Sequence, residues 1–150
     1  MAISQFVVFK ISNESFALDV SNIGSISGIN DVTSVPDSPG YIEGVMNMRG
    51  DIIPIVNLAK RFNIESDVKI KDKRVIVIEI ENKLFGFLVD DASKAIQIDT
   101  EDIADTPSLI KGNDGDYIDG ICKVENDILL LINLEKVLSH KEVVEIKSLE

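Results

Sequence analysis

Only a few side chains in this 150-residue chain have a type that could do chemistry, and none has a partner at the spacing that catalysis needs. His140 is the only histidine and no serine or cysteine nucleophile motif accompanies it, so we interpret it as a solvated residue. Cys122 is the only cysteine and lies in an apolar run, which predicts a buried, unreactive thiol. We therefore assign no residue to catalysis.

Two short motifs resemble functional sites, but each has a simpler interpretation. Asn113-Asp114-Gly115-Asp116 matches part of a calcium loop, yet the further acidic ligands that such a loop requires are missing, so we interpret it as an acidic turn. Arg49-Gly50-Asp51 spells an adhesion tripeptide, but nothing in the chain indicates secretion, so we expect the tip of a hairpin. The sequence predicts neither a metal nor a cofactor.

Composition and charge narrow the class of protein further. Apolar residues make up 45% of the chain, tryptophan is absent and aromatics reach only 5%, so the core must consist mostly of Ile, Val and Leu, which favours strands. The formal net charge of -11 argues against nucleic acid or an anionic membrane surface as a partner. A single cysteine and the absence of a signal segment predict a soluble protein of a reducing, intracellular compartment.

The elements that would position a site occur twice. Tyr41 to Phe62 aligns with Tyr117 to Leu138 at an offset of 76, and eight of the 22 positions are identical. Phe6 to Val20 recurs at an offset of 69, ending at Val89, so the chain is a tandem of two related halves. The changed offset places about seven extra residues in the second half, between Asp99 and Asp116.

The two copies differ most at the centre of the longer repeat. The first carries Asn47-Met48-Arg49-Gly50, whereas the second carries Lys123-Val124-Glu125-Asn126. The apolar frame that both copies keep indicates architecture, and the differing turn indicates a function given to one copy. An arginine there is not required by the fold, because the second copy has Glu125. On an acidic protein, Arg49 is a candidate anchor for a partner.

The pattern of each half predicts short strands joined by hairpins. A strand that includes Pro54 should lie at an edge or carry a bulge, because proline has no N–H to donate. Asn57 and Asn133 are predicted to cap short helices at 58–62 and 134–138. Residues 64–73 are charged and are predicted to form a solvated loop, whereas the apolar run 74–81 predicts a buried strand. We expect a mainly β fold built from two small barrels.

The chain resembles the CheW-like domain family of chemotaxis coupling proteins from about Gln5 to Leu138. The similarity rests on Phe6-Val7-Val8-Phe9, Phe16-Ala17-Leu18-Asp19-Val20 and the long, specific segment Gly44-Val45-Met46-Asn47-Met48-Arg49-Gly50-Asp51-Ile52-Ile53-Pro54-Ile55-Val56-Asn57-Leu58. The resemblance implies two pseudo-repeated, five-stranded SH3-like barrels with short helices. They would form one domain over 1–150, with intertwined subdomains centred on about 14–73 and 74–138 and a helical tail at 139–150.

The resemblance also implies a function without catalysis. Such proteins are adaptors in bacterial chemotaxis that couple the cytoplasmic tips of chemoreceptors to the regulatory domain of the histidine kinase CheA. The chain shows no phosphorelay histidine domain, ATP site or receiver, so a stand-alone adaptor is the match. We expect a cytoplasmic protein recruited to membrane-associated receptor arrays, with no cofactor and no direct contact with nucleic acid or membrane.

By the same resemblance, the partners would bind at two places. A receptor helix would lie in a groove between the barrels, lined by Ile23, Asn47, Arg49, Gly86, Ala92 and Ala95. The kinase would contact the first barrel near Ile29 and Val32, and Leu109 would make the second ring contact. Family members often place a glutamate where this chain has Ser25, so Arg49 must either pair with another acid, such as Glu43, or stay free for the receptor.

Two rival functions remain open at this point. The first is a small-ligand sensor with a cavity between the two halves. The second is a weak hydrolase, which the scarcity of catalytic residues argues against.

Overall fold

The computed structural model describes residues 2–105 and 117–148, and strands dominate these residues. The strands are β1 (Ile3–Ile11), β2 (Glu14–Asp19), β3 (Ser25–Gly28), β4 (Val32–Thr33), β5 (Ile42–Met48), β6 (Asp51–Asn57), β7 (Arg74–Ile80), β8 (Lys83–Val89), β9 (Asp91–Asp99), β10 (Ile118–Val124) and β11 (Asp127–Ile132). The α-helices are α1 (Leu58–Phe62) and α2 (His140–Lys147), and 3₁₀ turns lie at Val20–Asn22, Ile70–Asp72, Thr100–Asp102 and Leu134–Lys136. In this part of the chain, no helix has the length and apolar character needed to cross a membrane.

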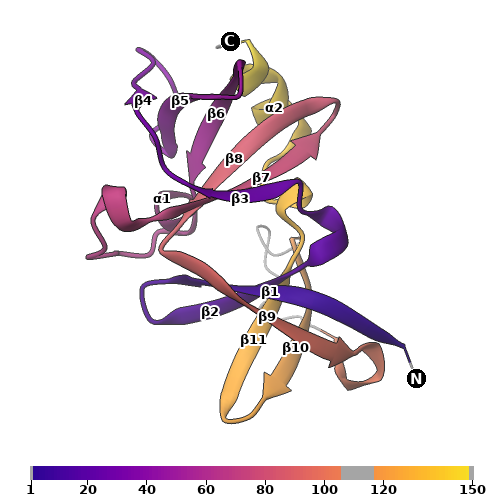
Figure 1. Ribbon diagram of the computed structural model, residues 1–150. Coiled ribbons are helices and arrows are strands. Elements are labelled where there is room, and N and C mark those ends of the chain that lie inside the picture. The colour runs from indigo at the N-terminus through magenta and orange to yellow at the C-terminus, as the bar shows by residue number, and fades with distance from the viewer. Residues whose placement is uncertain (1, 106–116, 149–150) are drawn as a thin grey trace.

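The strands form two sheets, one above the other in Figure 1. The lower one, sheet A, has the order β10-β11-β2-β1-β9, and the upper one, sheet B, has the order β3-β7-β8-β6-β5-β4. The predicted mainly β fold with two five-stranded SH3-like units is confirmed. Sheet B has a sixth strand, β4, which is only two residues long.

Each half of the chain lends a hairpin to the other half. Hairpin β1–β2 belongs to the first half by sequence but joins sheet A with β9, β10 and β11, and hairpin β7–β8 of the second half joins sheet B. The division of the chain near residue 74 therefore does not coincide with the division into sheets. The reason is that the two halves are defined by sequence similarity, whereas each sheet pairs strands from both halves.

The two sheets repeat one another residue by residue. The pair Ser25↔Val77 in sheet B has its counterpart in Lys94↔Val8 of sheet A, at the offset of 69. The parallel pairing of β6 with β8 likewise recurs as the pairing of β11 with β2. In sheet A the isolated bridge between Ala104 and Ile121 takes the place of β4. The internal repeat read from the sequence is thus a structural pseudo-symmetry.

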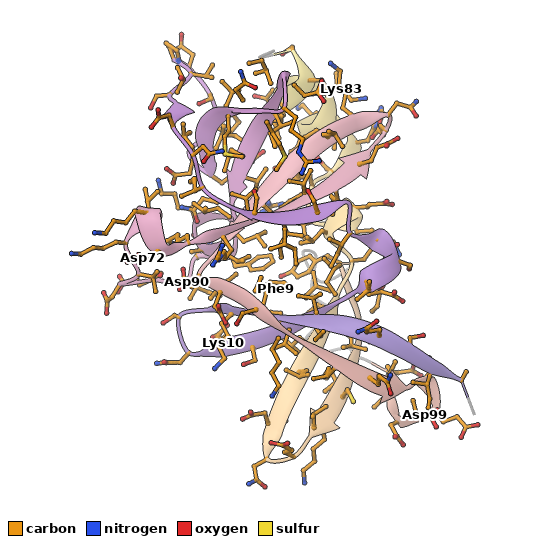
Figure 2. All side chains as sticks on the ribbon, in the orientation of Figure 1. Phe9, Lys10, Asp72, Lys83, Asp90 and Asp99 are labelled. Atoms are coloured by element: carbon orange, nitrogen blue, oxygen red, sulfur yellow. The ribbon has the colours of Figure 1, made fainter. Side chains whose placement is uncertain are left out.

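Strand β7 shows how the exchanged hairpins hold the sheets together. Val75 and Val77 pack into the core of sheet B, whereas Ile76 and Ile78 point the other way, into a core shared with sheet A. Successive side chains of a strand face opposite sides, so both faces of β7 are apolar and buried, as its continuous apolar sequence predicts. Phe9 of β1 lies in the same shared core, in the middle of the junction in Figure 2.

We call this shared cluster the junction core. It also receives α2, through the buried residues Val143 and Ile146. The buried members of the junction core are Phe9, Ile11, Phe16, Leu18, Ile42, Val56, Leu58, Ala59, Ile76, Ile78, Ile80, Phe85, Phe87, Val89, Ala92, Ile118, Ile132, Leu134, Val137, Leu138, Val143 and Ile146.

Local expectations for the longer repeat are largely confirmed. Strands β5 and β6 form the predicted hairpin, and Asn57 caps α1 by accepting a hydrogen bond from the Lys60 N–H at 3.2 Å. Asn133 caps the equivalent turn through the Glu135 N–H at 3.0 Å. That turn is a 3₁₀ helix of three residues instead of a helix over 134–138. Helix α2 then starts separately, with a capping box between Ser139 and Glu142.

Two expectations from the sequence were wrong. Strand β6 is not an edge strand, since it lies between β8 and β5. Pro54 is tolerated there because the pairing with β8 begins only at Ile55, and the bulge lies at the far end of the hairpin, between Ile42 and Gly44. Residues 64–73 are also not wholly solvated, because Lys73 is buried.

The helix caps Asn57 and Asn133 differ in the number of hydrogen bonds that they make, and this difference can be tested. Buried Asn57 also donates a hydrogen bond to Glu43 at 2.7 Å, whereas Asn133 caps only the 3₁₀ turn. We expect Asn57→Ala to lower the free energy of unfolding by about 1–2 kcal/mol and Asn133→Ala by about 0.5 kcal/mol. Urea denaturation measures both. Equal losses would show that the bond to Glu43 contributes nothing.

Candidate functional site

The tip of the β5–β6 hairpin presents Arg49 to solvent. Arg49 and Gly50 both have positive φ, 52° and 91°, as the tight turn of a two-residue hairpin loop requires. The Asn47 side chain holds this turn, because its Oδ1 accepts a hydrogen bond from the Gly50 N–H at 3.0 Å. Asn47 therefore positions the arginine, and both residues are exposed.

The acid suggested as a partner for Arg49 is engaged elsewhere. Glu43 lies 2.9 Å from Lys60 Nζ and accepts the hydrogen bond from Asn57. Burial raises the pKa of Glu43, but the bonds from Asn57 and Lys60 outweigh it and bring the pKa below its usual value. Over residues 2–105 and 117–148, the Arg49 side chain has no hydrogen bond or ion pair. Of the two alternatives for Arg49, the described residues therefore show the unpaired side chain, since Glu43 bonds Lys60 and Asn57 instead.

A hollow of about 510 Å³ lies beside this turn. The start of β6 and the start of β8 line it, because these two strands run parallel and begin at the same end of sheet B. Ile52, which is half exposed, supplies an apolar wall, and Lys83 adds a positive charge. The lining residues are Gly50, Asp51, Ile52, Ile53, Asn82, Lys83 and Leu84.

The other residues predicted for the receptor groove do not share this surface. Ala92 and Ala95 lie on β9, beyond the opposite end of β8, which is about 20 Å along the strand at the usual rise per residue. Ala95 is exposed, but Ala92 is buried in the junction core. Ile23 is partly buried against the same core. The structure thus brings together Asn47 and Arg49 but not the six residues as a set.

Gly86 belongs to the interior of sheet B. A Cβ at this position would lie 2.6 Å from Ile55 Cδ1 and 2.8 Å from Val75 Cγ1. Its counterpart in the other sheet is Ala17, which is also small and fully buried. The position needs a small residue for close packing, so the structure gives Gly86 a packing role within sheet B.

The two described residues predicted for the kinase face do lie together. Ile29 and Val32 line one hollow of about 730 Å³ at the β4 edge of sheet B. Half-exposed Ile70 and Lys71 also line this hollow, although their segment was expected to be a solvated loop. The only signal for them in the sequence is an isoleucine within a charged segment, and a single apolar residue of this kind does not mark a site by itself. Leu109 lies outside the described residues, as does the acidic turn at 113–116.

The remaining reactive side chains have structural surroundings. Cys122 is buried, and this burial, together with the charge of Asp102, raises the pKa of its thiol. His140 begins α2 in solvent, with Nδ1 3.0 Å from Glu81 Oε2. Among the described residues, no three His, Cys, Asp or Glu side chains gather as a metal site would require.

A polar cluster fastens α2 to sheet B. The Tyr41 hydroxyl donates to Glu142 Oε2 at 3.0 Å, and Arg61 contacts the same carboxylate and stacks over the Tyr41 ring. Burial and the adjacent carboxylate raise the pKa of Tyr41. Burial also raises the pKa of Glu142, but its hydrogen bonds from Ser139 and Tyr41 outweigh this, so its pKa is lowered. The cluster is therefore structural.

Two surface hollows with apolar walls and an exposed arginine, together with a buried thiol and a solvent-exposed histidine paired with Glu81, fit a binding protein. Residues 5–142 match the CheW-like domain, and the chain belongs to this family. Its function is that of an adaptor in chemotaxis signal transduction.

Individual relatives match over nearly their whole length. The chemotaxis protein CheW of Thermotoga maritima is 34% identical, over 91% of this chain and 90% of that protein. The chemotaxis protein CheW of Treponema pallidum is 30% identical, over 97% of this chain and 88% of that protein. The crystal structure of the scaffolding protein TtCheW from Thermoanaerobacter tengcongensis superposes with a TM-score of 0.84 at 30% identity, covering 95% and 92% of the two chains.

The interior position of Gly86 can be tested by substitution. We expect Gly86→Val to lower the free energy of unfolding by about 1–3 kcal/mol, because its side chain would overlap Ile55 and Val75. Gly40→Ala is the control, since a Cβ there meets nothing within 4 Å, and it should change stability by less than about 0.5 kcal/mol. Denaturant titration followed by circular dichroism gives both values. Unchanged stability of the Gly86→Val protein would contradict the interior position of Gly86.

Proposed function

We propose that this protein couples chemoreceptors to the histidine kinase CheA by binding both, and that it catalyses no reaction itself. The observation that carries the proposal is the match to CheW proteins and to a scaffolding protein over nearly the whole chain. The protein would work in the cytoplasm, recruited to receptor arrays at the membrane. The partners are the cytoplasmic tip of the receptor and the regulatory domain of CheA.

The β5–β6 turn is the receptor contact in this proposal. Three features support it: Arg49 has no partner within the described structure, its turn is held rigid by Asn47, and the adjoining hollow offers Ile52 to an apolar side chain. A preorganised arginine beside an apolar hollow suits an amphipathic helix with an acidic residue next to its apolar face. The equivalent turn of the second copy carries Glu125, so this contact would be made by one copy alone.

The hollow at the β4 edge is the kinase contact. Ile29, Val32 and Ile70 give it apolar walls, and Lys71 and Asp31 give it a charged rim. An apolar centre within a polar rim is typical of protein interfaces. Because this hollow and the Arg49 turn have no lining residue in common, both partners could be held at once.

A small-ligand sensor with a cavity between the halves has little support. The space between the sheets is filled by the junction core, including the fully buried rings of Phe9, Phe85 and Phe87. Binding sites for small molecules are usually preformed cavities. The hollows described above lie at the surface of sheet B.

The receptor contact is tested by reversing the charge of Arg49. We expect Arg49→Glu to weaken binding of a receptor fragment at least about tenfold, because it removes the anchor and repels an acidic partner. The melting temperature should not change, since Glu125 occupies the same backbone conformation in the second copy. Lys123→Glu, an equal charge change on β10, is the control. Unchanged receptor affinity in Arg49→Glu would remove the turn from the site.

The kinase contact is tested at Ile70. This side chain is half exposed, so Ile70→Asp should leave the fold intact while weakening binding of the CheA regulatory domain about tenfold or more. Val68→Asp is the matched control, because Val68 is exposed in the same segment but does not line the hollow. A three-component pull-down reads both contacts. Equal effects of the two substitutions would contradict a specific kinase contact at the hollow.

A further inference from the structure

Within the described residues, the chain passes from a strand of one sheet to a strand of the other at two places, and a third passage leads from β11 of sheet A to α2, which packs against sheet B. From β2 to β3 it crosses from sheet A to sheet B through an exposed segment that includes the 3₁₀ turn Val20–Asn22. From β8 to β9 it crosses back through one residue, Asp90. Any rotation of one sheet against the other must change backbone torsions in these connections. In the connection from β8 to β9, only Asp90 is available for that change.

Asp90 is buried and tied to both sheets. Its Oδ2 accepts hydrogen bonds from the Ser12 N–H at 2.7 Å, in the β1–β2 turn of sheet A, and from the Ser66 hydroxyl at 2.6 Å. Its Oδ1 lies 3.0 Å from Nζ of Lys73, which precedes β7 of sheet B. The Asp90 N–H donates to the carbonyl of Lys10 at 2.9 Å. We call Asp90, Lys73, Ser66 and Ser12 the Asp90 cluster.

The Asp90 cluster lies at the edge of the junction, with Phe9 at its middle (Figure 2). Both charged side chains are about 95% buried. Burial raises the pKa of Asp90, but the bonds from Ser66, Ser12 and Lys73 outweigh it and bring the pKa below its usual value. Removing one partner would leave the other charge buried without compensation, which is strongly unfavourable.

The pseudo-symmetry shows that the fold does not require this arrangement. The position equivalent to Asp90, at the offset of 69, is Ser21, which is exposed and bonds only to its neighbour Asp19. The junction core is apolar and closely packed, so it already favours one arrangement of the two sheets, and the Asp90 cluster acts in addition to it. Hydrogen bonds and a close ion pair are directional and can select an angle.

We propose that the Asp90 cluster fixes the angle between the two sheets, so that this crossing is a locked hinge. A consequence, which rests on the proposed function, is that the angle between the two sheets stays the same when partners bind. The lock itself is a property of the free protein and is tested without a partner.

Distances between spin labels on the two sheets measure this angle directly. Glu79 on β7 and Gln97 on β9 are exposed and are replaced by cysteine for labelling, in a Cys122→Ala background. The test variant is Asp90→Asn with Lys73→Met, which removes both buried charges together and so leaves none uncompensated. Asp91→Asn is the matched control, because the Asp91 side chain is exposed and, among the described residues, accepts a hydrogen bond from Ser93 alone.

We expect pulsed electron resonance to give a narrow distance distribution for the parent and the Asp91→Asn control. The double variant should give a broader or shifted distribution while remaining folded by circular dichroism. Ser66→Ala removes the hydrogen bond to Asp90 and the one from the Val68 N–H but keeps the ion pair, so it should broaden the distribution to a smaller extent. A folded double variant with the parent's distribution would overturn the proposal. If the double variant does not fold, an unchanged distribution in Ser66→Ala would overturn it.

Discussion

Burial of both faces of the exchanged hairpins is the constraint on which this structure depends. Strands β1, β2, β7 and β8 each turn one face to the core of their own sheet and the other to the junction core. Neither sheet can separate without exposing apolar surface of both hairpins, so the junction is as much an interior as either barrel. The two sheets therefore form one domain, and polar function is confined to turns, edges and crossings.

Those turns and crossings are where the two copies diverge. Three pairs of equivalent positions show this. Arg49 corresponds to Glu125, buried Asn57 corresponds to Asn133, and buried Asp90 corresponds to exposed Ser21. In the pairs Arg49/Glu125 and Asp90/Ser21 the side chain differs, whereas Asn57 and Asn133 are both asparagine and differ in burial and in the bond from Asn57 to Glu43. Since the apolar frame supplies the stability of both copies, one copy is free to acquire charges that serve binding or orientation. An adaptor needs this asymmetry, because identical halves would offer identical surfaces.

The sequence predicted the part of the candidate site that depends on local geometry. Arg49 and Asn47 were singled out because one copy departs from the other at a turn; the structure confirms the turn, and their role in binding stays a prediction. Ile70 was missed because its neighbours are charged, and Asp90 was missed because its partners Ser12 and Ser66 lie far away along the chain. The packing role of Gly86 was not foreseen, because a glycine at the surface and a glycine in a tight core cannot be told apart in a sequence.

The sequence by itself determined the duplicated plan, the hairpins, the helix caps and the apolar runs that must be buried. Only the tertiary structure decided that each hairpin joins the sheet of the other half, where Val77 pairs with Ser25 and Val8 with Lys94. The physical reason is that apolar patterning specifies that a face is buried without specifying against what. Two copies with the same pattern can pair within or across halves, and only the assembled core distinguishes the two.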